Sequence, residues 1–90
     1  FGPLNRQPLF YIKNCIDNGF TKLVGAEKNH LSIGIKDETE TNFYGIGFEM
    51  EKYISKIKMK NKFSILAHLQ NNEFRGNSKL QLLVKDIYFE

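Results

Sequence analysis

Cysteine is scarce in this sequence and tryptophan is absent: the 90 residues include one cysteine, Cys15, and no Trp. A lone cysteine cannot close a disulfide within the chain, and with only His30 and His68 as further soft ligands no spacing resembles a zinc site. Apolar runs are also short, and none approaches the roughly 18 residues that a membrane span needs. We therefore expect a cytoplasmic protein that needs no disulfide and has no membrane partner.

The chain also lacks a strong excess of one charge and any cluster of catalytic carboxylates. Its 13 Lys and Arg against 10 Asp and Glu give a net charge of +3, which permits a polyanionic partner without demanding one. Asp17, Asp37 and Asp86 stand apart with no histidine beside them, and Arg6 and Arg75 are the only arginines. Metal-dependent hydrolysis needs carboxylates that bridge metal ions. We expect no catalytic residue, no metal site and no cofactor within these residues, which disfavours a free-standing nuclease.

Apolar residues are plentiful enough for one packed core. They make up 41% of the chain, and eight Phe and four Tyr are among them. Because 90 residues rarely divide into two cores, we expect a single domain over residues 1–90, with residues 1–8 as a linker that leads into the first strand. The first residue is Phe1 rather than Met, so we expect the chain to be a piece of a longer protein.

Alternation of apolar and polar residues predicts a mostly β fold. The clearest case is Leu31, Ile33 and Ile35, which alternate with polar or small residues. A change of phase between Val84 and Ile87 indicates a bulge or a bend around a barrel in the last strand. The predicted strands cover about residues 9–20, 30–36, 43–48, 63–69 and 80–89, and the last two are joined by a turn at Gly76-Asn77-Ser78.

A short helix is predicted between the third and fourth strands. Met50, Tyr53, Ile54 and Ile57 follow the three- and four-residue spacing of an amphipathic helix. Three strands, a helix and two strands is the order of the OB-fold, a partly open five-stranded barrel that binds oligonucleotides on strands two and three and on two flanking loops. The alternative, an SH3-like barrel, normally lacks a helix at this position. The fold class is therefore predicted as all-β, a five-stranded OB-fold-like barrel.

Three blocks of residues resemble the C-terminal OB domain of RecJ-type exonucleases of the DHH family, which are specific for single-stranded DNA. They are Phe1-Gly2 with Asn5, Pro8 and Phe10; Ile46-Gly47-Phe48-Glu49-Met50; and Asn72-Glu73-Phe74-Arg75-Gly76 followed by Leu80-Gln81-Leu82 and Val84-Lys85-Asp86-Ile87. The resemblance spans nearly the whole chain. Such domains commonly carry tryptophan where this chain has Phe74, so a smaller stacking surface is expected.

The resemblance implies a function in DNA repair and recombination. A domain of this kind would be a monomeric module that holds single-stranded DNA for the catalytic domains of the same parent chain, where Mn²⁺ or Mg²⁺ would support hydrolysis. The aspartate-rich catalytic motifs of the family are absent from these 90 residues, so the chain itself is not expected to be an enzyme. The alternative is an OB domain that packs on the catalytic core or a partner without binding nucleic acid.

Two groups of residues are candidates for nucleic-acid contact. The first lies around the last turn, where Phe74 would stack on a base and Arg75 would bind phosphate, with Asn72 and Lys79 beside them. The alternative is that Phe74 folds back to cap the barrel. The second follows from the alternation: with Leu31, Ile33 and Ile35 pointing inward, His30 and Lys36 face outward. With Tyr44, Ile46 and Phe48 also taken as inward, Phe43 is predicted to face outward beside Gly45 and Gly47, either as an exposed stacking platform or as an aromatic that covers the barrel end.

Overall fold

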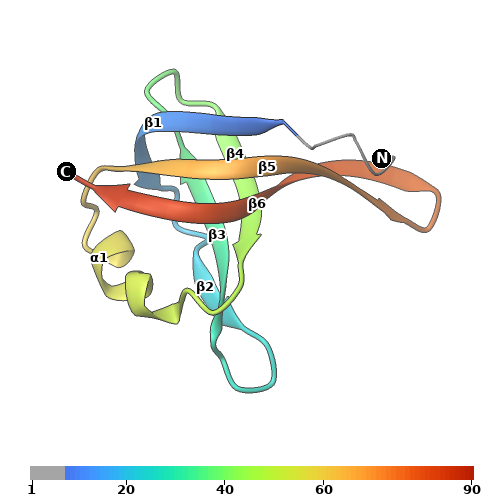
Figure 1. Ribbon diagram of the computed structural model, residues 1–90, viewed down its shortest axis with the longest axis horizontal. Coiled ribbons are helices and arrows are strands. Elements are labelled where there is room, and N and C mark those ends of the chain that lie inside the picture. The colour runs from blue at the N-terminus through green and yellow to red at the C-terminus, as the bar shows by residue number, and fades with distance from the viewer. Residues whose placement is uncertain (1–7) are drawn as a thin grey trace.

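The computed structural model describes residues 8–90, except for the side chains of residues 72–74 and 78. Its elements in chain order are β1 (Leu9–Asp17), β2 (Lys22–Val24), β3 (His30–Lys36), β4 (Asn42–Gly47), the 3-10 turn η1 (Glu51–Tyr53), the helix α1 (Ile54–Lys58), β5 (Phe63–Phe74) and β6 (Asn77–Phe89) (Figure 1). The predicted all-β class and the single short helix are confirmed. The helix lies between β4 and β5, which are the third and fourth of the five long strands.

Five strands close into a ring with the OB-like order. β1 pairs with β5, β5 with β6, β6 with β4, β4 with β3, and β3 with the end of β1. All of these pairs are antiparallel except β4 and β6, which run parallel where Gly45 lies opposite Leu82 and Ile46 opposite Leu83. The three-residue β2 pairs with His30, Leu31 and Ser32 of β3, while the end of β1 pairs with Ile35 and Lys36.

The first strand is shorter than predicted and bends to close the ring. A register shift between Ile12 and Cys15, with Asn14 at φ 55°, lets β1 leave β5 and reach β3. The prediction of one strand over residues 9–20 is wrong, because β1 ends at Asp17. Beyond Asp17, the hydroxyl of Thr21 makes the hydrogen bonds to β3 that a strand backbone would make. It donates to the Gly34 carbonyl at 3.0 Å and accepts from the Gly34 N–H at 3.1 Å.

The core fills the ring and is covered at one end by the helix. Alternate residues of β3 point inward as predicted, and Ile57 of α1 is fully buried against them (Figure 1). Burial raises the pKa of Cys15 to about 12, with a further contribution from the charge of Asp37, so this thiol packs as a small apolar side chain. The buried apolar residues are Cys15, Leu31, Ile33, Ile35, Ile57, Phe63, Ile65, Ala67, Leu82, Val84 and Ile87. Within the described part of the chain, no helix is long and apolar enough to cross a membrane.

The last strand contains the predicted bulge. Leu66 pairs with Asp86 but the next residue, Ala67, pairs with Val84, so Lys85 is the extra residue. The bulge explains why inward positions change phase along this strand, and the prediction is confirmed.

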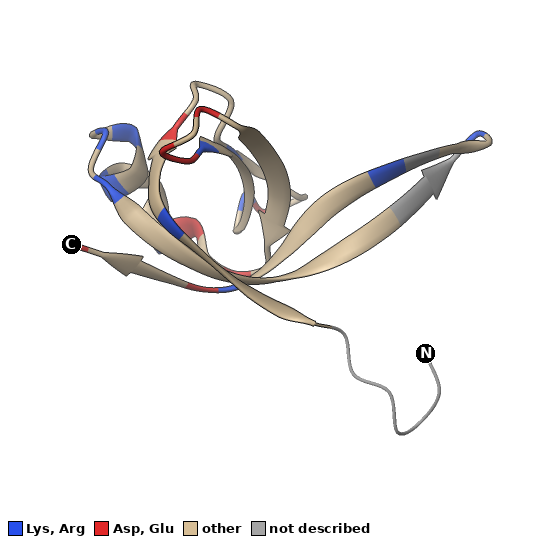
Figure 2. Cartoon of the chain, turned by 90° about the horizontal axis from the view of Figure 1, so that it is seen from above, with Lys and Arg blue, Asp and Glu red and all other residues tan. Residues whose placement is uncertain are grey.

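The strands β5 and β6 continue beyond the ring as a two-stranded arm. β1 pairs with β5 only as far as His68, and β4 joins β6 only from Leu82, so between these points the two strands pair with each other among the described residues. We call residues 69–81 the arm, and Figures 1 and 2 show it projecting away from the ring. The tip is Arg75 and Gly76, both with positive φ (51° and 80°), as a two-residue type I′ hairpin turn requires. The turn predicted at Gly76-Asn77-Ser78 is therefore wrong, since β6 begins at Asn77.

Candidate nucleic-acid interface

The orientation of β4 is opposite to the one predicted. Ile33 lies opposite Gly45 and Ile35 opposite Phe43, and residues directly opposite each other in an antiparallel pair share a face. Because Ile33 and Ile35 are buried, Phe43 turns inward and packs against the core instead of forming an exposed platform. Tyr44, Ile46 and Phe48, predicted to be inward, lie on the outer face.

Glycine on the inner face explains why this orientation is required. A Cβ atom on Gly45 would lie 2.5 Å from the carbonyl oxygen of Leu82 and 2.7 Å from its Cβ, so β4 and β6 could not pair this closely with any larger residue. A Cβ on Gly47 would lie 2.7 Å from the sulfur of Met50. In the alternation of residues 43–48 both phases contain large apolar side chains, and only these close approaches decide between them.

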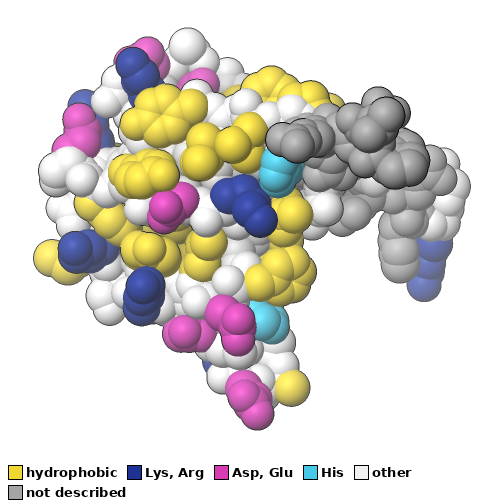
Figure 3. Space-filling view, viewed as in Figure 1, with side chains coloured by type: hydrophobic (Ala, Val, Ile, Leu, Met, Phe, Trp, Pro, Cys, Tyr) yellow, Lys and Arg dark blue, Asp and Glu magenta, His cyan; other side chains and the backbone are white. Residues whose placement is uncertain are grey.

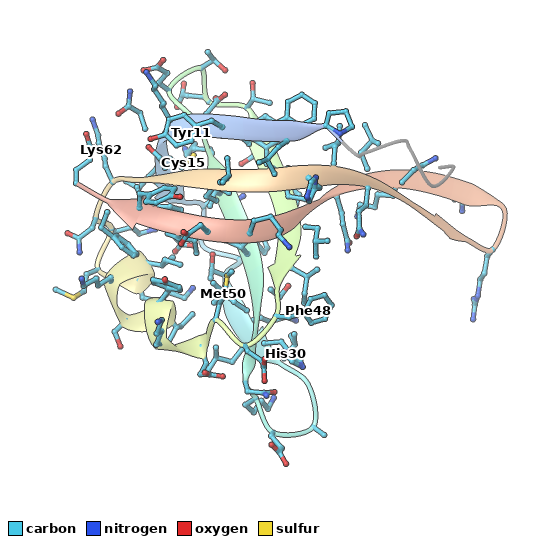
Figure 4. All side chains as sticks on the ribbon, in the orientation of Figure 1. Tyr11, Cys15, His30, Phe48, Met50 and Lys62 are labelled. Carbon is cyan, nitrogen blue, oxygen red and sulfur yellow. The ribbon has the colours of Figure 1, made fainter. Side chains whose placement is uncertain are left out.

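Aromatic side chains line the outer face of β3 and β4. Phe20 lies edge-to-face with Tyr44, with 6.3 Å between ring centroids, and His30 lies edge-to-face with Phe48 at 5.2 Å. Phe20, Tyr44 and Phe48 are 68%, 43% and 57% exposed. Figure 4 shows Phe48 and His30 together near the end of β4. We call Phe20, Tyr44, His30 and Phe48 the aromatic strip; strands two and three of an OB-fold carry its binding face, and these correspond to β3 and β4.

The backbone around Phe20 holds its ring over β3. Gly34 provides the space for Phe20, because a Cβ atom at position 34 would lie only 2.9 Å from the Cβ atom of Phe20. The side-chain oxygen of Asn18 accepts from the Phe20 N–H at 3.1 Å, and the amide nitrogen of Asn18 donates to the Asn42 side chain at 3.0 Å. Phe20 is therefore displayed by a fixed loop at the end of the split first strand. The prediction missed it because it placed Phe20 within a continuous strand.

His30 lies on the outer face as predicted, and its ring orientation is fixed. The N–H of Glu49 donates to Nδ1 of His30 at 3.0 Å, so the neutral ring carries its proton on Nε2. The side chain is half-buried beneath Phe48. It can offer Nε2–H to a ligand while supporting the neighbouring aromatic ring.

Positive side chains flank the aromatic strip. Lys36 faces outward as predicted, but it forms an exposed ion pair with Glu40 at 3.8 Å. Lys22 on β2 is exposed and lies opposite Ser32, on the same outer face. Arg75 and Lys79 are exposed on the arm, where Figure 2 shows positive residues along the projecting hairpin.

The remaining predicted contacts lie on the arm. The side chains of Asn72 and Phe74 fall outside the described residues, so their roles stay predictions. The backbone corrects the position of Phe74, because it is the last residue of β5, paired with Asn77, and not part of the turn.

Lysines around α1 are engaged by a buried carboxylate. Asp17 has a side chain only 1% exposed, and its Oδ2 lies 3.6 Å from Nζ of Lys58 and 3.4 Å from Nζ of Lys60. Burial acts to raise the pKa of Asp17, but the Thr21 hydroxyl, the Gly19 N–H and the two ammonium groups together hold it below its usual value. This cluster ties the end of β1 to the segment after α1. Among the described residues, no group of three or more His, Cys, Asp and Glu could hold a metal ion.

Comparison with known proteins agrees with this geometry. Searches of the curated proteins and of the solved structures give no match. A family model described as "RecJ OB domain" matches residues 1–86, which is nearly the whole chain. An OB domain of this kind is a non-catalytic module, so the chain is not itself an enzyme. With its OB-like ring and this match, the chain belongs to the RecJ OB domain family and is an OB module of a RecJ-like protein.

Proposed function

We propose that this domain binds single-stranded DNA and holds it for a separate, metal-dependent nuclease domain of the same parent protein. The observation that carries the proposal is the aromatic strip. Phe20, Tyr44 and Phe48 are large rings left open to solvent on the outer face of β3 and β4, where stacking on bases would cover them. Base stacking on an aromatic ring contributes roughly 1–3 kcal/mol and tolerates any sequence, because every base has a π-face.

Cations around the strip would neutralise phosphate groups of a bound strand. Lys22 stands beside the strip, and Lys79 and Arg75 extend the positive charge along the arm. An arm of this kind corresponds to the loop between the last two strands of an OB-fold, which commonly contacts the ligand. A single strand lying over the strip would therefore meet stacking groups and cations at once.

Holding the substrate would assist a nuclease by raising its local concentration. A binding module linked to a catalytic domain turns the second encounter into an intramolecular one. We propose that the parent protein acts with Mn²⁺ or Mg²⁺ in DNA repair and recombination in the cytoplasm. In this proposal the domain is monomeric, needs no cofactor of its own and contributes binding rather than chemistry.

A second candidate function, docking on protein, is favoured by another surface. Leu9, Tyr11 and Tyr88 are 51%, 52% and 45% exposed on the outer face of β1, β5 and β6, and the two tyrosine rings lie 6.3 Å apart. Figure 3 shows apolar side chains gathered over these strands. We call this surface the tyrosine face. It suits packing against the catalytic core or a partner, which can coexist with DNA binding on β3 and β4.

Titration of a labelled oligonucleotide tests the first proposal. Fluorescence anisotropy of a labelled dT15 strand should show binding at low salt, with weaker binding to a duplex of equal length. Tyr44→Ala should lose roughly 1–3 kcal/mol of binding free energy, because one stacking ring is removed. The matched control is Tyr11→Ala on the tyrosine face, a tyrosine of similar exposure whose loss should leave affinity unchanged.

The outcome separates the two candidate functions. Both tyrosines are well exposed, so neither variant should lower the unfolding midpoint much. If the folded chain fails to bind dT15, or if Tyr11→Ala weakens binding and Tyr44→Ala does not, the aromatic strip is not the interface and docking becomes the better proposal.

A further inference from the structure

A groove opens at the base of the arm, where β6 leaves β4. Pairing between these strands stops at Gly45 and Leu82, and the arm then swings away from the start of β4. The space between them is a cavity of about 290 Å³, at the small end of the roughly 300–1,000 Å³ found for ligand pockets. Its lining residues are Asn42, Phe43, Tyr44, Leu69, Leu80, Gln81 and Leu82.

The walls of this groove are mainly apolar side chains. A second cavity, of about 250 Å³ next to β1, shares Phe43, Leu69 and Leu82 with it, so the two adjoin. Leu80 is 62% exposed although it faces the groove from the arm. A flat apolar ring seated here would cover Leu80 on one side and contact Phe43 on the other.

Amide groups stand among the apolar walls. The side-chain oxygen of Asn42 accepts a hydrogen bond from Asn18 at 3.0 Å, which leaves the Asn42 amide nitrogen as a donor toward a ligand. Gln81 adds a second amide, and its side chain makes no hydrogen bond to the described residues. Asn and Gln amides are among the side chains that can form hydrogen bonds with the edges of nucleobases.

The groove is continuous with the aromatic strip through Tyr44. Tyr44 is one of the residues that line the groove, and its ring contacts Phe20, so a strand stacked on Phe20 and Tyr44 would reach the groove with its next nucleotide. Lys79 is exposed one residue from Leu80 on the arm, on the other face of the hairpin, where it could meet a phosphate of the strand outside the groove. A neutral polypeptide segment would use the apolar walls without the charge attraction that every phosphate of a DNA strand would gain from nearby cations.

We propose that this groove is a slot for one unstacked nucleobase of the bound strand. The proposal rests on the single-stranded-DNA function above and adds a base-reading position to it. Tyr44 and Phe43 would contact the ring, Leu80 would close over it, and Asn42 would donate to an acceptor on its edge. Binding at the strip is indifferent to sequence, whereas the slot would give the domain a preference among bases.

Filling the slot tests the proposal. Leu80→Trp places a large ring on the arm wall of the groove, and Met59→Trp is a matched control because Met59 is also an exposed apolar residue, 70% exposed, at the end of α1 away from the arm. Affinities of the 90-residue chain and its variants for labelled dT15, dA15 and dC15 are measured at one low salt concentration, with circular dichroism and thermal unfolding to check the fold.

Leu80→Trp should weaken binding of the preferred strand by about tenfold, a factor that corresponds to about 1.4 kcal/mol, and should reduce the preference among the three strands. Asn42→Ala should reduce the preference while the strip still binds all three. Met59→Trp should behave like the original chain.

Three other results would overturn either the slot or the proposed function. If Leu80→Trp and Asn42→Ala bind all three strands as the original chain does while Tyr44→Ala is weakened, the slot is overturned and the strip remains, leaving the groove to a polypeptide or another occupant. If Leu80→Trp and Met59→Trp weaken binding equally, the slot is also overturned. If the original chain binds none of the strands, the proposed function fails first.

Discussion

The buried carboxylate of Asp17 forms two ion pairs at the point where β1 pairs with β3 and closes the ring. Its partners are Lys58 and Lys60, and Nζ of Lys60 also donates to the Asp17 carbonyl at 3.1 Å. The two lysines are 43% and 56% exposed, so they remain partly hydrated while they neutralise the carboxylate. These contacts hold the end of β1 against the segment that follows α1, and they leave these lysines poorly placed to bind a nucleic acid.

The lowered pKa of Asp17 predicts a pH dependence of stability. Folding favours the carboxylate, so its contribution is fully present above the unfolded pKa of about 3.9 and is lost as the pH falls through the lower folded pKa. Asp17→Asn should lower the free energy of unfolding at neutral pH by about 1–2 kcal/mol. This is less than the roughly 3–5 kcal/mol of a fully buried pair, because the freed lysines can hydrate. Urea unfolding between pH 2.5 and 7 measures both effects.

An exposed ion pair serves as the control for this prediction. Glu40→Gln removes the partner of Lys36, where both side chains are exposed, and should change stability by less than about 1 kcal/mol. If Asp17→Asn loses stability toward acid as steeply as the original chain does, another carboxyl group is responsible.

Single residues also show where sequence patterns stop being informative. The alternation of β3 is unambiguous, and Leu31, Ile33 and Ile35 are buried as predicted. In β4 both phases carry apolar residues, so Phe43 was placed on the wrong face. The deciding contact is that of Gly45 with Leu82, a residue 37 positions later in the sequence (82 − 45), and no local pattern contains it.

Among the secondary-structure elements, the arm is the one that we expect to be least stable. A two-stranded hairpin is marginal by itself in water, and residues 69–81 pair only within the hairpin among the described residues. Its tip places Arg75 at φ 51°, which a residue other than glycine adopts at some cost. We therefore expect the local stability of the arm to be lower than that of the ring.

Replacing Arg75 with Asn tests the contribution of its positive charge to binding while keeping a residue that the turn favours. Arg75→Asn gives the Asn-Gly pair that type I′ turns prefer, so the arm should be at least as stable as before. Affinity for dT15 should fall, and the slope of log affinity against log salt should become shallower by about 0.7, as expected for one phosphate contact to a single strand. Anisotropy titrations at several salt concentrations provide the measurement.

The control for the arm is Lys79→Gln, which removes a charge without touching the turn. It should give the same change of slope. An unchanged affinity and slope in both variants would show that the arm lies away from the DNA.

Element prediction from the sequence succeeded where the determinants are local. The helix was found from the spacing of Met50, Tyr53 and Ile57, and the bulge near Lys85 from a change of phase. The break after Asp17 was missed, because it depends on the Thr21 hydroxyl bonding to Gly34 across the sheet. The exposed position of Phe20 follows from that break. Because the break depends on a non-local contact, the sequence pattern does not predict this part of the aromatic strip.

At the scale of the whole molecule, the surfaces divide between two kinds of contact. The aromatic strip and the arm offer stacking groups with positive charge, whereas the tyrosine face on β1, β5 and β6 is mainly apolar. The net charge of +3 is too small to attract nucleic acid without this local arrangement. In the proposed function, a domain with both surfaces would bind DNA on one side while packing on the rest of its parent protein on another.

The salt dependence of binding should reveal how the two kinds of contact share the affinity. If Lys22, Arg75 and Lys79 each neutralise one phosphate, log affinity for dT15 should fall with log salt at a slope of about −2, since each contact to a single strand contributes about 0.7. Phe20→Ala should lower affinity by roughly 1–3 kcal/mol at every salt concentration and leave this slope unchanged, because stacking releases no counterions. A slope near zero would show that the ligand is held by apolar contacts alone, and a slope altered by Phe20→Ala would show that this ring positions the cations instead of stacking independently of them.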